Sequence, residues 1–297
     1  MYDSLIAALH DAESDGLSLA EVAIRAELRP GRQTREVVLN HLQRALTVMR
    51  EARAEGMTGR PRSVSGLVGG DAAKLQQAGQ NKTGGPLAGS LFGQVLAGAI
   101  AVQEVNAAMG VIVAAPTAGG AGVLPGVLLA VGDAAGASEL QLLEGLAVAG
   151  LVGAVIAQRA SLSGAEAGCQ AETGAGAAMA AAAGVHVLGG TPRQAIYAAA
   201  LAMQGTLGLV CDPLGGLVEV PCVFRNATGA AIAMAGIEMA LAGIEFPIPM
   251  DEVIDTMGEI GRTMDQRYRE TAGGGLAATP TGRKITRTRL GLDARTR

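Results

Sequence analysis

Three cysteines are the residues of this chain best suited to chemistry, and each lies in a segment rich in Gly or Pro. Cys169 follows a glycine, Cys211 precedes an Asp-Pro pair, and Cys222 follows a proline. No Cys-x-x-Cys pair is present, so the spacing matches no zinc finger and suggests separate loops that converge in space. Three thiolates are one fewer than the four that close a structural zinc site or a cubane iron–sulfur cluster. A four-iron cluster on these three would keep one iron open as a Lewis acid.

A simpler interpretation of the cysteines also fits the pattern. Free cysteines often act as small buried hydrophobic residues, and the residues alone leave both alternatives open. An odd number of cysteines argues against a disulfide framework and fits a reducing cytoplasm. The histidines His10, His41 and His186 have no metal-ligand spacing, so we expect them to be structural or solvated.

Glycine loops and isolated polar residues form a second group of candidates. Gly119, Gly120 and Gly122 precede an expected helix, where free N–H groups suit a carboxylate, although the residues alone favour a packing loop in a small-residue core. Glu104, Asn106 and Thr117 interrupt apolar sequence, so each needs a partner if buried, in either a structural network or a substrate cavity. Two nucleotide motifs fail: Gly120–Pro125 ends in Pro where a dinucleotide fingerprint needs Gly, and Asn81–Thr83 lacks the Gly of a P-loop.

The elements that must position these residues are expected to be helices. The chain has 297 residues with 2% aromatics, no Trp and 44 Gly, so its core must consist of closely packed small-residue helices. A net charge of −4 shows no excess of basic residues of the kind that indicates nucleic-acid binding. Mean hydropathy is positive, but the longest clean apolar run, 145–157, is too short to span a membrane. No N-terminal signal is visible, and we expect a cytoplasmic protein.

The fold class predicted from periodicity is all-α, a multi-helix domain with Gly/Pro-rich loops converging on the cysteines. Residues 1–62 form a charged helical hairpin, and residues 63–297 form the main domain with a loose tail from Thr279. The hairpin helices begin after Ser18, ending near Pro30, and after Thr34. The further helices are expected at about 87–109, 123–131, 139–158, 170–183, 192–207, 226–242 and 250–268; residues 111–113 are a candidate short strand.

Several longer segments carry a resemblance to a known family. They are Glu104–Gly110, Ala114–Gly119, Ser163–Glu172, Leu209–Cys222, Arg225–Ala227, Tyr268–Thr271 and Gly274–Ala277. Together they resemble the α part of the iron–sulfur-dependent L-serine dehydratases, from about Ser63 to Lys284. The resemblance implies a 4Fe–4S cluster on Cys169, Cys211 and Cys222, and conversion of L-serine to pyruvate and ammonia.

The resemblance also implies a β partner chain, because this family is made as one chain or as separate α and β chains. The first 60 residues are too few and too helical for the β part, and its Ser-His-Thr motif is absent. No cysteine lies near the C-terminus, so the tail supplies no fourth thiolate. We expect an oligomer without nucleic-acid or membrane partners, whose catalytic base comes from this chain or its partner. The expected substrate contacts are Ser65, Gly69, Gly70, Asn106, Thr117, Gly119 and Gly120.

Other functions were weighed against this one. A pyridoxal-phosphate β-eliminase performs the same overall reaction, but it needs a Schiff-base lysine, and only Lys74, Lys82 and Lys284 are available, none in a typical setting. A non-catalytic structural subunit with unligated cysteines is the non-enzyme alternative. Elimination from another β-substituted amino acid, such as cysteine, is a third.

Overall fold

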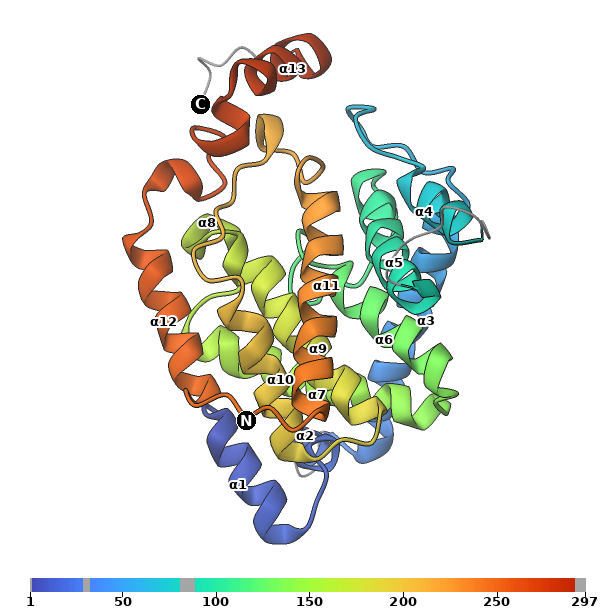
Figure 1. Ribbon diagram of the computed structural model, residues 1–297, viewed down its shortest axis with the longest axis vertical. Coiled ribbons are helices and arrows are strands. Elements are labelled where there is room, and N and C mark those ends of the chain that lie inside the picture. Colours follow the sequence, from blue (N-terminus) through green and yellow to red (C-terminus); the bar gives the residue numbers. More distant parts are fainter. Residues whose placement is uncertain (1, 29–32, 81–88, 292–297) are drawn as a thin grey trace.

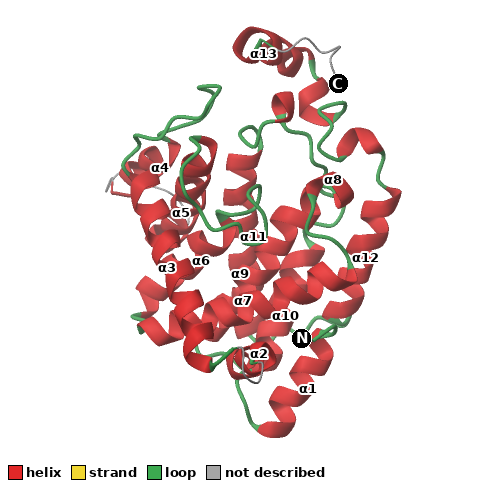
Figure 2. Ribbon diagram, turned by 180° about the vertical axis from the view of Figure 1, so that it is seen from behind, coloured by secondary structure: helices red, strands yellow, loops and turns green. Residues whose placement is uncertain are grey.

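The computed structural model describes residues 2–28, 33–80 and 89–291, and this part of the chain is helical (Figure 1; Figure 2). It contains no β-strand, only isolated bridge residues such as the pair Cys211 and Arg269, so the predicted all-α class is confirmed. The α-helices are α1 (Leu5–Asp15), α2 (Leu19–Glu27), α3 (Arg35–Met57), α4 (Asp71–Gln80), α5 (Gly89–Ala107), α6 (Val123–Ala135), α7 (Glu139–Arg159), α8 (Gly164–Ala167), α9 (Ala175–Val187), α10 (Pro192–Gln204), α11 (Cys222–Leu241), α12 (Met250–Thr263) and α13 (Pro280–Leu290).

Four short helices complete the described part: the π-helix η1 (Gln170–Gly174) and the 3₁₀ helices η2 (Leu214–Gly216), η3 (Gln266–Tyr268) and η4 (Gly275–Ala278). Local capping explains several helix starts. Ser18 and Thr34 cap α2 and α3 as predicted, each side chain accepting from the backbone N–H three residues on. Ser138 and Thr191 form complete capping boxes at α7 and α10.

Helix α9 is the centre of the core, and α6, α7, α10 and α11 pack around it (Figure 1). Its sequence is almost entirely Ala, Gly and Val, and all but one of its residues are buried. A helix that is apolar all round must be covered on every side. Small residues allow this close packing: a Cβ at Gly184 would lie 2.4 Å from Ile237 Cδ1. The composition had predicted such a core.

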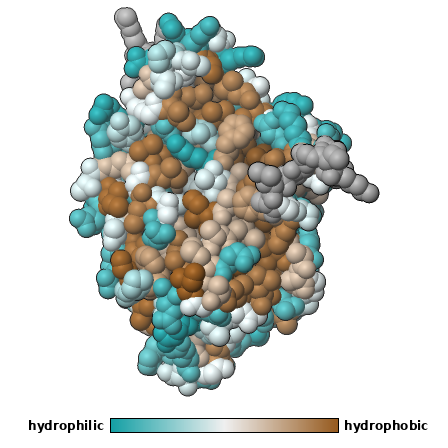
Figure 3. Space-filling view, in the orientation of Figure 1, coloured by the Kyte–Doolittle hydropathy of each residue, from teal (hydrophilic) through white to brown (hydrophobic). Residues whose placement is uncertain are grey.

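Helix α7 alone among the described helices has the length and hydropathy of a membrane span. However, 67% of its 18-residue window is buried, and its principal neighbour is α9. The helix therefore belongs to the core. Apolar side chains also reach the surface on the face that carries α11 (Figure 3); Phe224 on this helix is 43% exposed.

The structure differs from the sequence predictions in several places, including α4 (Asp71–Gln80), where no helix was expected. Residues 5–15 form a helix before the predicted hairpin, and α2 ends at Glu27; Pro30 and the predicted start at Leu87 lie outside the described residues. Residues 111–113 are not a strand. Helix α11 begins at Cys222, four residues earlier than predicted. The tail that was expected to be loose forms α13, whose N-cap Thr279 accepts from Gly282 N.

Candidate active site

The three cysteines lie at element boundaries and are buried and free. Cys169 is the N-cap residue of η1, and Cys222 is the first residue of α11. Cys211 lies in an extended segment held by the C-terminal part of the chain: its N–H donates to Tyr268 O at 2.8 Å, and its carbonyl accepts from Glu270 N at 2.8 Å. Residues near position 270 therefore position a thiol 60 places earlier in the sequence.

The thiols influence one another's protonation. Burial is the largest cause that raises the pKa of Cys211, and the charges of Cys169, Glu172 and Cys222 raise it further. Burial likewise raises the pKa of Cys222, followed by the charge of Cys169. Because Coulomb interactions fall with distance, Cys169 and Cys222 lie close enough to Cys211 for their charges to act on it.

Arg225 supplies positive charge to this neighbourhood from the first turn of α11. Its guanidinium donates to Val210 O at 2.8 Å and lies 2.7 Å from Asp212 Oδ1. The second contact is an ion pair without hydrogen-bond alignment, since Asp212 Oδ1 has no hydrogen-bond partner among the described residues. The other Asp212 oxygen accepts from Leu276 N at 2.6 Å. Arg225 and Asp212 thus tie α11, the Cys211 segment and η4 together.

The three cysteines do not form a ready-made site for a single metal ion. Within the described residues, no three His, Cys, Asp or Glu side chains are grouped closely enough to hold one metal ion. A single zinc ion needs every sulfur at about 2.3 Å from the metal, whereas a cluster distributes its thiolates over different iron atoms. Three free, buried thiols are the donor type that a cluster needs; burial raises the pKa of Cys169 and opposes the loss of its proton, whereas the charge of Arg225 favours that loss.

Glu172 places a carboxylate between the cysteines and the glycine loop. It lies in the π-helix η1, a rare element that often occurs at functional sites. Its Oε1 accepts from the Thr117 hydroxyl at 2.7 Å, and its Oε2 lies 3.9 Å from Cys211 Sγ. Burial raises its pKa, and the Thr117 hydrogen bond opposes that shift. A Cβ at Gly164 would lie 2.7 Å from Oε2, so this position admits no side chain without a shift.

A buried amide network holds the predicted glycine loop. Gln103 Nε2 donates to Ala118 O at 2.8 Å, and Asn106 Nδ2 donates to the same oxygen at 3.2 Å. Asn226 Nδ2 donates to Gly119 O at 2.6 Å, and its Oδ1 accepts from Gly122 N at 2.9 Å. The sequence left two alternatives for Asn106, a structural hydrogen-bond network or a substrate cavity. The structure places Asn106 in such a network.

The other predicted substrate contacts lie on the α4–α5 side. Ser65 hydrogen-bonds through its N–H and hydroxyl to buried Glu219, three residues before Cys222. Gly69 and Gly70 have positive φ and lead into α4, where Asp71 N donates to Glu104 Oε1 at 2.6 Å. Burial raises the pKa of Glu104, and the Asp71 N–H opposes it. Substrate binding by Ser65, Gly69 and Gly70 stays a prediction.

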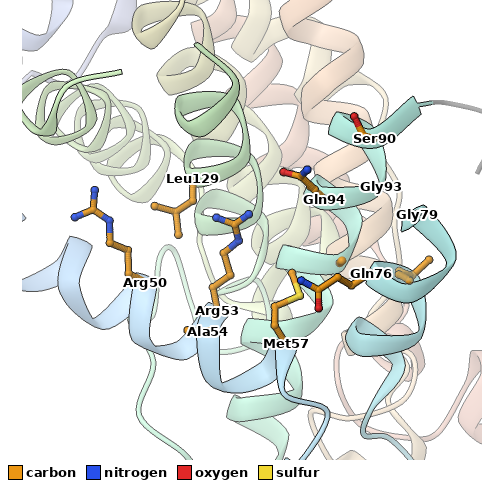
Figure 4. Close-up of a pocket in the computed structure, with 12 residues that line it drawn as sticks. Arg50, Arg53, Ala54, Met57, Gln76, Gly79, Ser90, Gly93, Gln94 and Leu129 are labelled. Atoms are coloured by element: carbon orange, nitrogen blue, oxygen red, sulfur yellow. The ribbon is translucent and has the colours of Figure 1, made fainter. Parts of the chain in front are cut away.

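A cavity of about 500 Å³ lies away from the cysteine segments, between α3, α4, α5 and α6 (Figure 4). Arg50 and Arg53 line it, but they pair with Glu139 and Asp133 at 2.7 and 2.9 Å. Its arginine charges are thus neutralised locally, and none of the predicted site residues lines it.

Two of the three lysines considered for a pyridoxal cofactor lack an enclosed setting. Lys74 is exposed and pairs with Asp71, and Lys284 is exposed on α13. Lys82 lies outside the described residues.

Sequence reasoning had singled out Thr117, Gly119 and the cysteines but had given no role to Glu172, Arg225, Gln103 or Asn226. Glu172 lies three residues after Cys169 and Arg225 three after Cys222, which puts both within one turn of a thiol. That proximity was the available signal. Nothing in the spacing indicated that Glu172 meets Thr117, because 55 residues separate them.

Comparison with known proteins shows which family this chain resembles. A family described as "Serine dehydratase alpha chain" matches residues 14–277. The chain is 49% identical over 267 residues to "Probable L-serine dehydratase, alpha chain" of Bacillus subtilis (strain 168), covering 90% of this chain and 88% of the relative. It is 39% identical over 272 residues to "L-serine dehydratase, alpha chain" of Peptoniphilus asaccharolyticus, covering 92% of each. "L-serine dehydratase TdcG" of Escherichia coli (strain K12) is 44% identical over 181 residues, 60% of this chain and 40% of that protein.

Proposed function

Because the chain belongs to the serine dehydratase alpha-chain family, we propose that it is the α chain of a lyase that deaminates L-serine to pyruvate and ammonia. Two relatives that it covers almost completely carry that activity and the words "alpha chain" in their names. The word "alpha" in these names supports a β partner chain. We also propose a cytoplasmic location, in keeping with the unpaired thiols.

We further propose that Cys169, Cys211 and Cys222 hold a 4Fe–4S cluster. The observation that supports this proposal is that all three cysteines are free and buried, and that the charges of Cys169 and Cys222 both act on Cys211 although 42 and 11 residues separate them along the chain (169 to 211 and 211 to 222). When bound through three cysteines, such a cluster supplies a Lewis acid that helps the β-hydroxyl of serine to leave.

The chain's own residues have separate tasks in this proposal. Arg225 compensates the negative charge of the thiolates, and its bond to Val210 O fixes the segment of Cys211 relative to α11. The backbone N–H groups of Gly119 and Gly120 bind the substrate carboxylate, and Thr117 orients the carboxylate of Glu172. The group that removes the α-hydrogen belongs to this chain or its partner.

Anaerobic reconstitution tests the cofactor part of the proposal. We expect about four iron atoms per chain, with a visible absorbance band, and a large loss of both in Cys211→Ser. The serine variant preserves the shape of the side chain, and urea unfolding of the metal-free variant and the metal-free parent separates any loss of folding stability from the loss of iron. Unchanged iron content in all three single cysteine variants would contradict cluster binding.

Activity tests the reaction and the partner separately. We expect pyruvate from L-serine only when the iron-loaded α chain is combined with a β chain, and we expect the two chains to elute together. Efficient turnover by the α chain alone would contradict the two-chain proposal. Equal turnover without iron, with an aldimine absorbance band, would favour the pyridoxal-phosphate alternative.

A further inference from the structure

On one side of the Ala118–Gly120 turn, the carbonyl groups of Ala118 and Gly119 accept hydrogen bonds from side-chain amides. The carbonyl of Ala118 accepts from Gln103 and Asn106, and the carbonyl of Gly119 accepts from Gln103 and Asn226. Gln103 and Asn226 are completely buried, at 0% exposure. These amides therefore fix the orientation of two successive peptide groups.

The opposite side of the same turn presents N–H groups. In a trans peptide the carbonyl and the following N–H point in opposite directions, and neither peptide here is cis. The N–H groups of Gly119 and Gly120 must therefore point away from the amide network. Both residues are buried, and neither N–H donates a hydrogen bond to any described residue. A buried N–H without a partner is costly, so a ligand is the natural acceptor.

The carboxylate of Glu172 lies directly against this turn. A Cβ at Gly119 would be 2.7 Å from each Glu172 carboxylate oxygen, and a Cβ at Gly120 would be 2.7 Å from the Glu172 carbonyl oxygen. The Thr117 hydroxyl occupies one lone pair of Oε1. The other oxygen, Oε2, accepts from Cys211 Sγ at 3.9 Å, and among the described residues no lysine, arginine or histidine forms an ion pair with this carboxylate, so an external cation has no charged competitor here.

Two free amide donors beside a free carboxylate match the charge pattern of an amino acid. The α-carboxylate and α-ammonium of an amino acid share one carbon, so their receptor needs donors and an anion side by side. We propose that Glu172 binds the α-ammonium group of the substrate while the N–H groups of Gly119 and Gly120 bind its α-carboxylate. Cys211 borders this position, since its Sγ donates to Glu172 Oε2 at 3.9 Å. The proposal rests on the amino-acid lyase function proposed above and adds the residue that recognises the ammonium group.

A matched pair of inert ligands tests this assignment on the iron-loaded two-chain enzyme. α-Methyl-L-serine and 3-hydroxy-2,2-dimethylpropanoate differ only in that a methyl group replaces the ammonium group, and neither has an α-hydrogen to eliminate. Calorimetric titration gives the Kd of each. We expect Glu172→Gln to weaken α-methyl-L-serine by about ten- to a hundredfold, the range of a charge-assisted hydrogen bond, and to change the second ligand by less than about threefold.

Glu166→Gln is the matched control, because Glu166 is exposed in the same motif and its carboxylate accepts from Ser161 at 2.6 Å. It should leave both Kd values unchanged. If Glu172→Gln reduces iron content, Thr117→Val replaces it, since this variant keeps the carboxylate but removes the hydrogen bond that fixes Oε1. We expect it to weaken α-methyl-L-serine alone, by about tenfold or less.

Three results would overturn the assignment: equal weakening of both ligands, which indicates a structural role; unchanged preference for the ammonium ligand; and a loss of kcat with that preference intact, which indicates a catalytic base. The wild-type enzyme separates these results from failure of the proposed function. If it forms no pyruvate from L-serine, the function is wrong; if it does and the ligand preference survives in Glu172→Gln, only the ammonium assignment is wrong.

Discussion

Asn226→Ala should be among the most damaging single substitutions in this chain. Asn226 is fully buried and makes four hydrogen bonds: to Gly119 O at 2.6 Å, Cys222 O at 2.9 Å, Gly122 N at 2.9 Å and Gln103 at 3.3 Å. Each is worth about 1 kcal/mol net. Gly119 O keeps a second donor, Gln103, at 3.3 Å, whereas the buried Gly122 N–H loses its acceptor. We therefore expect the free energy of unfolding to fall by about 3 kcal/mol.

Urea unfolding of the metal-free chain measures this loss directly. Thr228→Ala is the control, because Thr228 lies on the same helix, is exposed and bonds only the Phe224 carbonyl at 3.3 Å; it should change stability by less than about 0.5 kcal/mol. Asn226→Asp separates packing from hydrogen bonding, since it preserves shape but turns an oxygen toward two carbonyl oxygens. A loss below about 1 kcal/mol in Asn226→Ala would refute the argument that this amide network holds the glycine turn.

Three further substitutions have defined outcomes. Gly119→Ala adds a Cβ 2.7 Å from the Glu172 carboxylate oxygens, so it should lower the free energy of unfolding in urea by about 1–3 kcal/mol. The control is Gly150→Ala, whose Cβ would meet nothing within 4 Å and should raise the free energy of unfolding by about 0.5–1 kcal/mol. Arg225→Lys cannot keep both the hydrogen bond to Val210 O and the ion pair with Asp212, so the iron that the chain retains after anaerobic desalting should fall. The exposed control Arg267→Lys should retain its iron. Equal retention in the two variants would contradict the positioning role of Arg225. Burial raises the pKa of Glu104, so its stabilising contribution is complete below its ordinary value of 4.5 and is lost as pH rises through the raised pKa. Glu104→Gln should therefore flatten the fall in Tm of the metal-free chain above about pH 5, and an unchanged slope would contradict this.

Local signals in the sequence were sufficient for much of the fold. Capping residues such as Ser18 and Thr34 predicted helix starts correctly, because the side chain and the N–H it accepts from are only three residues apart. The Ala/Gly-rich composition predicted a closely packed core. The start of α11 was missed because Pro221-Cys222 resembles a loop locally. The tail helix was missed because its charged composition carries little apolar periodicity.

The sequence by itself determined the chemical inventory of the site: three thiols without a fourth, a glycine turn, and the motifs that carry the family resemblance. Only the tertiary structure decided which groups face one another. Glu172 meets Thr117 across 55 residues, and Asn226 meets Gly119 across 107. Such pairs depend on how α5, η1 and α11 pack, and no short-range pattern records that packing. The orientation of the Gly119 and Gly120 N–H groups follows from those distant amides, and so does the site's proposed capacity to hold both charges of an amino acid.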